Sequence, residues 1–212
     1  MGSEDKLIVF DFGNVLIDLN YDRHFKAYRD LFGKEWPDHD YPDAVMRAMH
    51  RYEKGEISDD AFIWVFQQIN PAINPRFIVN AWITLLGDIH SSRIQMLERL
   101  SRTYELALLS NINSLHLRHI HRYLDTTFGI KDFEERFFSH VFYSHHIGMR
   151  KPEEDIYKNL ESITGRPAEE ILFIDDREDN ILKARSIGWQ GIQHDPGVEI
   201  SEQIDKYLQQ IN

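Results

Sequence analysis

The chain has 212 residues, enough for one substantial hydrophobic core with an additional subdomain. Its 24 basic and 35 acidic side chains give a formal net charge of −11, which repels nucleic acid and anionic membrane surfaces, so we expect neither as a partner. The lack of cysteine excludes disulfide bonds and thiolate chemistry, so any metal must be bound by oxygen or imidazole ligands.

Targeting signals are the next feature that the sequence can exclude. No apolar stretch approaches the roughly 20 residues of a membrane span. The N-terminus lacks the basic segment followed by an apolar segment that is typical of a signal peptide. We therefore expect a cytoplasmic protein, and the composition leaves its oligomeric state open.

The first strand is predicted at residues 7–10, a short run of apolar residues of the kind found in strands that are covered on both faces. From residue 18 to residue 87 strand signals are weak and helical signals are strong. In one segment of this region the apolar positions i, i+3, i+4 and i+7 are Phe62, Val65, Phe66 and Ile69. The pattern predicts a helical insertion after the first strand.

After the insertion, four further apolar runs of strand length alternate with helical patterns. They lie at residues 106–109, 141–143, 171–174 and 191–193. Ser91 or Ser92 is expected to cap the helix before the first of these strands, and Gly165 to cap the C-terminus of the helix after Pro152. Strands that alternate with helices indicate a parallel sheet with right-handed crossovers.

This order of elements predicts an α/β fold with a doubly wound, parallel, Rossmann-like sheet. Residues 1–17 and 88–212 are expected to form the core domain. Residues 18–87 are expected to form a helical cap that stands over the edge of the sheet.

Polar groups follow the predicted strands directly or after a few residues. They are Asp11, Ser110 with Asn111, Lys151, and Asp175 with Asp176. In an open α/β sheet, ligands bind at the carboxyl ends of the strands. We therefore expect these groups, which are far apart in the sequence, to form one site.

Asp11 is the predicted nucleophile of this site. Its carboxylate stands at a strand end beside Gly13, where the backbone can approach a ligand closely, and it could attack phosphorus to form an aspartyl-phosphate. The attack brings an anion up to a phosphate dianion, so a divalent cation must neutralise both. Asp11, the Gly13 carbonyl and Asp176 are the expected Mg²⁺ ligands. Asp175 is a further candidate, although only one of two successive residues usually reaches a metal.

The oxygens of a bound phosphate also need hydrogen-bond donors. Ser110 provides a hydroxyl group, and Asn111 provides an amide and a backbone N–H. Lys151 adds a positive charge, and Pro152 disfavours the α conformation at Lys151, which directs the ammonium group towards the site. These three residues are the predicted phosphate-binding groups.

The four segments, in this order, resemble the four motifs of the haloacid dehalogenase-like hydrolase superfamily, most of whose members are Mg²⁺-dependent phosphatases with an aspartate nucleophile. The segments are DFGNVLID, SNINSLH, RKPEEDIY and FIDDREDNI, and the resemblance covers about residues 7–193. They look most like a bacterial subgroup that includes α-D-glucose-1-phosphate phosphatase. On this match, Asp11 corresponds to the nucleophile, Lys151 to the third motif, and the helical insertion to the superfamily's cap.

The chain departs from the family pattern at Gly13. Most phosphatases of the superfamily have an aspartate there, which acts as general acid and base. General acid–base assistance contributes about 10²–10⁴ in rate, so its loss favours a good leaving group, such as that of an anomeric sugar phosphate. Alternatively Asp18, His24 or Glu53 replaces it, and the sequence does not choose among them. Glu53 lies at a glycine turn that could face the substrate, whereas Asp18 is equally typical of a turn or a helix cap.

The sequence therefore predicts a Mg²⁺-dependent phosphomonoester hydrolase that acts on a small phosphorylated metabolite, with a sugar phosphate as the favoured substrate. Two alternatives stay open. The chain could be a phosphotransferase or phosphomutase with the same intermediate, or a phosphate-binding protein that lost turnover together with the aspartate at position 13. His116 and the cap aromatics Trp64, Phe66 and Trp82 are interpreted as structural or surface residues.

Overall fold

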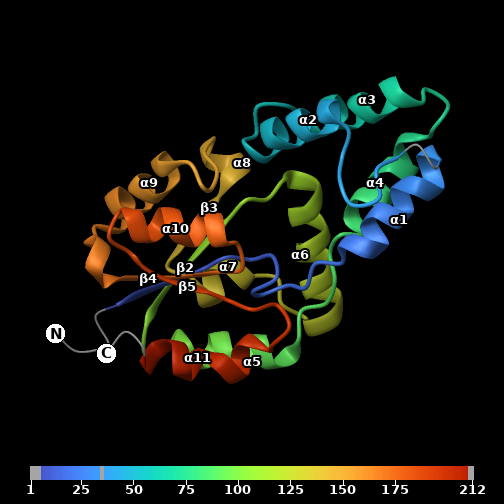
Figure 1. The fold of residues 1–212 in the computed structure, drawn as a ribbon. Coiled ribbons are helices and arrows are strands. Elements are labelled where there is room, and N and C mark those ends of the chain that lie inside the picture. The colour runs from blue at the N-terminus through green and yellow to red at the C-terminus, as the bar shows by residue number, and fades with distance from the viewer. Residues whose placement is uncertain (1–5, 34–35, 210–212) are drawn as a thin grey trace.

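A five-stranded parallel sheet forms the centre of the protein (Figure 1). The computed structural model describes residues 6–33 and 36–209. The strand order is β3-β2-β1-β4-β5, and each pair of neighbours is parallel. The strands are β1 (Leu7–Phe10), β2 (Glu105–Ser110), β3 (His140–Tyr143), β4 (Ile171–Asp175) and β5 (Gln190–Gln193). The predicted α/β class with a doubly wound parallel sheet is confirmed.

The apolar residues of the central strands divide between two hydrophobic cores. In β1, Leu7 and Val9 belong to one core, and Ile8 and Phe10 belong to the other. Because side chains alternate across a strand, a continuous apolar run buries both faces of the sheet. The sequence of β1 therefore explains why the strand lies in the middle of the sheet.

Helices cover both faces of this sheet and give a three-layer arrangement. The face with Ile8 and Phe10 is covered by α5 (Ser91–Leu100), α6 (Ser114–Phe128), α7 (Phe133–Phe137) and α11 (Ile200–Gln209). The opposite face is covered by α9 (Glu154–Thr164) and α10 (Glu178–Ser186). The short helices α8 (Ser144–Ile147) and η2 (Ala168–Glu170) lie in connections.

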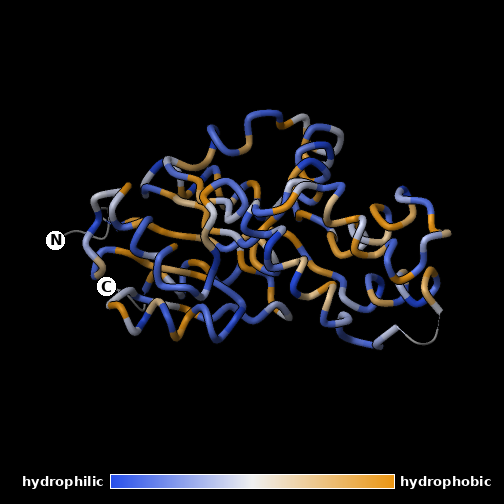
Figure 2. The backbone as a smooth tube through the Cα atoms, turned by 90° about the horizontal axis from the view of Figure 1, so that it is seen from above, coloured by the Kyte–Doolittle hydropathy of each residue, from blue (hydrophilic) through white to orange (hydrophobic). Residues whose placement is uncertain are grey.

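The helices α1 (Tyr21–Phe32), α2 (Asp43–Glu53), α3 (Asp59–Ile69) and α4 (Pro75–Ile83) stand to one side of the sheet, and we call them the helical cap (Figures 1 and 2). The cap has its own apolar core, which is rich in aromatic rings. Its aromatic members include Tyr28, Trp36, Phe62, Phe66 and Trp82. Tyr28 stacks on Trp36, with ring centroids 4.8 Å apart, and on Phe66, at 5.2 Å. Trp64, by contrast, is 58% exposed.

Two antiparallel segments connect the cap to the sheet. The backbone N–H of Asp18 donates to the carbonyl of Asp88 over 3.0 Å, and Gly87 donates to the carbonyl of Asp18 over 2.7 Å. A Cβ on Gly87 would lie 2.9 Å from that same Asp18 carbonyl oxygen, so this close approach requires glycine. The domain boundaries at residues 17/18 and 87/88 stay a prediction, and residues 1–5 and 210–212 of the predicted core domain lie outside the described residues.

The helix ends agree with the prediction in one case and differ in another. Gly165 adopts the left-handed conformation, with φ 66°, directly after α9, as predicted. The prediction for α5 was wrong: the helix begins at Ser91, and His90 occupies the capping position without a side-chain hydrogen bond. Apolar periodicity locates a helix but not its first residue. Within the described residues, no helix combines the length and apolar character that a membrane span requires.

The separate core of the cap gives a first test. Phe66→Ala should lower the free energy of unfolding by roughly 3–5 kcal/mol, because it removes a fully buried ring and leaves a cavity. Trp64→Ala, on the same helix, is the matched control and should cost less than about 1 kcal/mol because its side chain is exposed. Urea unfolding measures both. Equal losses would contradict the assignment of these two side chains to the inside and outside of the cap.

Candidate active site

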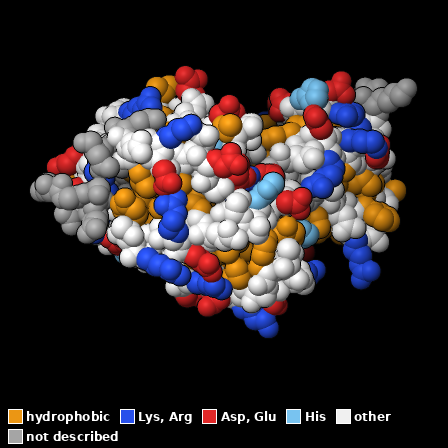
Figure 3. Space-filling model, turned by 90° about the horizontal axis from the view of Figure 1, so that it is seen from below, with side chains coloured by type: hydrophobic (Ala, Val, Ile, Leu, Met, Phe, Trp, Pro, Cys, Tyr) orange, Lys and Arg blue, Asp and Glu red, His pale blue; other side chains and the backbone are white. Residues whose placement is uncertain are grey.

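A cavity of about 430 Å³ lies between the helical cap and the carboxyl ends of the strands. This volume is within the range of sites for small molecules, roughly 300–1,000 Å³. The sheet side contributes Asp11, Gly13, Ser110, Asn111, Lys151 and Asp176 to its lining, and the cap contributes Tyr21, Tyr41, His50, Glu53 and Trp82. Figure 3 shows charged and histidine side chains on the surface where the two parts of the molecule meet.

Three carboxylates meet at the sheet edge of this cavity. Asp11, Asp175 and Asp176 each offer an oxygen, and these oxygens all lie within 4.8 Å of one another. The parallel pairing of β1 with β4 brings them together, because Phe10 is in register with Ile174 and the N–H of Asp11 donates to the carbonyl of Ile174 over 2.9 Å. The structure thus joins residues that are more than 160 positions apart.

Lys151 lies between two of these carboxylates. Its Nζ is 2.7 Å from Oδ1 of Asp11 and 2.6 Å from Oδ2 of Asp175, and its side chain is 1% exposed. Asp175 is also held by Asn180, whose Nδ2 donates to both carboxylate oxygens over 3.0 Å, and by the backbone N–H of Arg177. Both oxygens of Asp175 are therefore occupied by protein donors. Its position fits a residue that anchors Lys151 rather than one that binds a ligand.

Asp176 lies on the cavity side of the pair and differs from Asp175 in its contacts. Its Oδ2 accepts a hydrogen bond of 2.8 Å from Nδ2 of Asn14. Asn14 has the left-handed φ of 55°, and its Oδ1 accepts from the N–H of Leu19 over 3.1 Å. Asn14 was not predicted from the sequence as a site residue. Its place directly after Gly13 could have indicated it, because asparagine tolerates the left-handed conformation that a sharp turn needs.

Burial and mutual repulsion perturb the ionisation of these carboxylates. Burial raises the pKa of Asp11 from 3.8 to about 7, against the lowering effect of Lys151, and Asp175 and Asp176 raise it further. Burial also raises the pKa of Asp176, although the hydrogen bond from Asn14 lowers it. Three acidic groups thus share one lysine. Such an excess of buried negative charge is stabilised when a cation binds.

The loop after β2 carries the predicted phosphate-binding residues. Ser110 is buried at the end of the strand and lines the cavity. The side chain of Asn111 instead binds the backbone of Lys151: its Nδ2 donates to the Lys151 carbonyl, and its Oδ1 accepts from the Lys151 N–H, both over 2.8 Å. The Asn111 amide thus positions the loop that carries Lys151. Asn111 also lines the cavity, and its contact with a phosphate stays a prediction.

Leu19 packs directly against Gly13, so a side chain at position 13 would require the Leu19 side chain to shift. A Cβ on Gly13 would lie 2.9 Å from Cδ1 of Leu19, which lines the same cavity. The space that a side chain at position 13 would enter is thus occupied by an apolar group. The expected Gly13 carbonyl ligand stays a prediction, and Gly13 does line the cavity beside Asp11.

The structure separates the three candidates for a replacement proton donor. Asp18 lies outside the cavity lining, 2.8 Å from Nη2 of Arg93. His24 is fully buried inside the cap, where its Nδ1 lies 3.1 Å from the Ala81 carbonyl and its Nε2 contacts the Tyr41 hydroxyl. Burial lowers the pKa of His24 to about 3. The structure therefore does not bring Asp18 or His24 to the cavity, and of the three candidates only Glu53 lines it.

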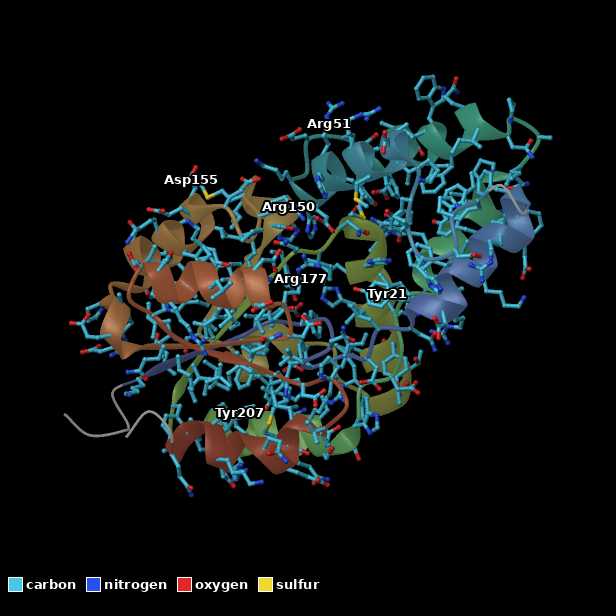
Figure 4. All side chains as sticks on the ribbon, viewed as in Figure 1. Tyr21, Arg51, Arg150, Asp155, Arg177 and Tyr207 are labelled. Carbon is cyan, nitrogen blue, oxygen red and sulfur yellow. The ribbon has the colours of Figure 1, made fainter. Side chains whose placement is uncertain are left out.

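Several polar residues of the cavity were not predicted from the sequence. Tyr21, Arg150 and Arg177 converge on the space between cap and sheet (Figure 4). Nη2 of Arg150 lies 3.0 Å from Glu53. His116 also lines the cavity, stacked on Trp82 with ring centroids 4.9 Å apart, and burial lowers its pKa to about 4. Only tertiary packing reveals these contacts, except that Arg150 adjoins Lys151 in the sequence.

The ionisation of Asp11 gives a test that requires no substrate. An acid whose pKa is higher in the folded state than in the unfolded state destabilises the folded state as the pH rises. For Asp11 this loss of stability develops between the unfolded-state pKa of about 4 and the folded-state pKa of about 7. In the absence of metal, Asp11→Asn should therefore raise the free energy of unfolding at pH 8, by on the order of 2–4 kcal/mol, and by much less at pH 5. Urea titrations at both pH values measure the difference.

The matched control for this test is Asp205→Asn, because Asp205 is 65% exposed and pairs only with Arg99 in the described structure. Its stability should differ little from that of the wild type at either pH. If Asp11→Asn were less stable than the wild type at pH 8, the claim that the site carries an excess of negative charge would be contradicted.

Comparisons with known proteins agree with this geometry. The family model described as haloacid dehalogenase-like hydrolase matches residues 6–188. The chain is similar to the D-ribitol-5-phosphate phosphatase of Bacteroides thetaiotaomicron, with 22% identity over 215 residues, 96% of this chain and 98% of the relative. A shorter match, 33% identical over 67 residues, is to a drimenol cyclase of Aspergillus calidoustus and spans 32% of this chain but only 13% of that protein.

Solved structures give the same result. A haloacid dehalogenase family enzyme of Bacteroides thetaiotaomicron, crystallised with magnesium and inorganic phosphate, matches with a TM-score of 0.80 and 26% identity over 93% of this chain and 98% of that one. The family model spans most of the present sequence. The chain therefore belongs to the haloacid dehalogenase-like hydrolases.

Proposed function

We propose that the protein is a Mg²⁺-dependent phosphomonoester hydrolase that acts on a small phosphorylated metabolite, with a sugar or polyol phosphate as the favoured substrate. The observation that carries the proposal is the group of Asp11, Asp175 and Asp176 with Lys151 at the edge of a 430 Å³ cavity. The likeness to a D-ribitol-5-phosphate phosphatase supports the same class of substrate.

The donor set fits Mg²⁺. The available ligands are oxygens, and the local excess of carboxylates over cations matches a small divalent ion, which prefers carboxylate oxygens. Asp11, Asp176 and the Gly13 carbonyl would bind the ion. When bound, it neutralises the nucleophile and the phosphate and so permits their approach. Asp175 would remain with Lys151, because its oxygens already accept hydrogen bonds from protein donors.

The reaction follows from the position of Asp11. Its carboxylate oxygen attacks phosphorus, the P–O bond to the organic group breaks, and an aspartyl-phosphate forms while the alcohol leaves. Lys151, 2.7 Å from Asp11, aligns the carboxylate and provides charge for the phosphoryl oxygens, to which the Ser110 hydroxyl donates. Water then attacks phosphorus, which releases phosphate and restores Asp11.

The departing alcohol requires a proton, and the position that usually supplies it is Gly13. Glycine has no side chain that could donate a proton, and the adjacent space is occupied by a methyl group of Leu19. The absence of such an acid costs about 10²–10⁴ in rate for poor leaving groups, and less for an anomeric phosphate. The glycine at position 13 also motivates the alternative that the protein binds phosphate esters without hydrolysing them. A search for phosphatase activity decides between the hydrolase and this binding protein.

A phosphatase screen tests the proposal. Small phosphate esters, including glucose 1-phosphate and ribitol 5-phosphate, are incubated with the wild type, with and without Mg²⁺, and phosphate release is measured. We expect release that depends on the metal and falls at least about 10³-fold in Asp11→Asn, because the nucleophile is lost. Asp155→Asn is the control, since Asp155 is exposed on α9 and is not part of the cavity lining (Figure 4). Equal release by wild type and Asp11→Asn would refute the nucleophile, and transfer to an added sugar instead of water would indicate a phosphotransferase.

A further inference from the structure

Glu53 is an acidic residue of the cavity that the proposed chemistry does not use. It is the last residue of α2, its side chain is 15% exposed, and it lines the cavity from the cap side. Arg150 donates from Nε over 3.2 Å to Oε2 of Glu53, and its Nη2 lies 3.0 Å from the same oxygen. Oε1 accepts no hydrogen bond from any residue in the described ranges. One oxygen is thus fixed by the protein, and the other is left for a ligand.

The segment that carries Glu53 is held firmly on the core. Nζ of Lys54 lies 2.9 Å from Glu153, and the Tyr52 hydroxyl lies 2.9 Å from Oγ of Ser114. Gly55 approaches α8 so closely that a Cβ there would lie 2.2 Å from the His145 carbonyl oxygen. These contacts fix the position of Glu53 relative to the sheet. A carboxylate that is held in a fixed position can discriminate between ligands by where their hydrogen-bonding groups lie.

The charges around the cavity limit the ligands that Glu53 can bind. Among the described lining residues, Arg150 is paired with Glu53, Lys151 with Asp11 and Asp175, and Arg177 with Asp179 at 2.8 Å. Burial lowers the pKa of the two lining histidines, His50 and His116, which keeps both neutral at pH 7. On the side of the cavity that the helical cap lines, every described cationic side chain is therefore paired with a carboxylate, and none is left to bind a second anionic group of a ligand. This side offers a carboxylate oxygen, which accepts hydrogen bonds from hydroxyl groups.

We propose that Glu53 determines substrate specificity: its Oε1 accepts hydrogen bonds from hydroxyl groups on the organic part of the phosphate ester, and Arg150 positions it. The site then prefers phosphate esters of neutral polyhydroxy compounds to those of carboxylic acids. The inference rests on the proposed hydrolase function. Arg150 directly precedes Lys151 in the chain. One loop therefore carries both the arginine that positions the Glu53 carboxylate and the lysine that aligns the nucleophile.

The test compares esters that share a primary-alcohol leaving group but differ in hydroxyl number. Propyl phosphate, glycerol 1-phosphate and ribitol 5-phosphate form this series, and 3-phosphoglycerate supplies a carboxylate. For the wild type, kcat/KM should rise along the series and be low for 3-phosphoglycerate. In Glu53→Gln the ratio of kcat/KM for ribitol 5-phosphate to that for propyl phosphate should fall by about 10- to 100-fold, because hydrogen bonds to a charged acceptor are lost.

Two further variants make the test specific. Arg150→Gln should lower the same ratio, mainly through KM, because the carboxylate loses its positioning partner. Glu56→Gln is the matched control: Glu56 follows the same turn, but its side chain is 47% exposed and pairs with Arg51 outside the cavity lining, so the ratio should equal that of the wild type. Thermal unfolding confirms that each variant is folded.

The possible contrary results are distinct. Unaltered kcat/KM values for both propyl phosphate and ribitol 5-phosphate in Glu53→Gln would overturn the specificity role. An equal loss of kcat/KM for the two esters, which also leaves their ratio unaltered, would overturn it as well and would instead indicate a role of Glu53 in the common chemical step. A wild type that hydrolyses none of the esters, nor p-nitrophenyl phosphate, in the presence of Mg²⁺ would overturn the hydrolase proposal and this inference with it.

Discussion

The contact of Lys151 with Asp11 and Asp175 is the interaction on which the site depends. A buried ammonium group lies within 2.7 Å of two carboxylates, and a third carboxylate, that of Asp176, lies beside them. Removal of Lys151 would leave the buried carboxylates of Asp11 and Asp175 without their cationic partner, which is costly in a low-dielectric environment. One lysine does not neutralise three acids, however: burial raises the pKa of Asp11, and repulsion by Asp175 and Asp176 adds to this effect. The proposed divalent cation would relieve this electrostatic strain, which links the stability of the sheet edge to its proposed chemistry.

The rest of the structure serves to hold these charges in place. The parallel register of β1 and β4 sets Asp11 beside the end of β4, and the Asn111 amide fixes the backbone of Lys151. Asn180 and the N–H of Arg177 hold Asp175. The helical cap, with an aromatic core of its own, closes the other side of the cavity and brings Glu53 towards it. Packing energy from three separate apolar cores thereby supports a charged arrangement that would not form by itself.

The sequence predicted the parts of this picture that depend on local patterns. The strand from residue 7 to residue 10 was predicted with its observed bounds, because a short run of apolar residues in a chain of alternating strands and helices is typical of a buried strand. The sheet class followed from the alternation of strands and helices, and the family followed from the order of four segments. The side-chain amide of Asn111 and the positions of Asp18 and His24 were not predictable, because each depends on which neighbours the tertiary fold provides. Gly13 was noticed in the sequence, but only the structure shows that Leu19 occupies the adjacent space. The roles of the individual site residues and the boundaries of the cap stay predictions.

The most direct test of the central claim is a crystal structure of the protein with Mn²⁺, in which anomalous scattering locates the ion. The account predicts one ion bound by Asp11 and Asp176 at about 2.0–2.3 Å, with Lys151 still in contact with Asp175 and no bond from Asp175 to the metal. An ion bound elsewhere in the molecule, or no ion between these carboxylates at saturating Mn²⁺, would contradict it.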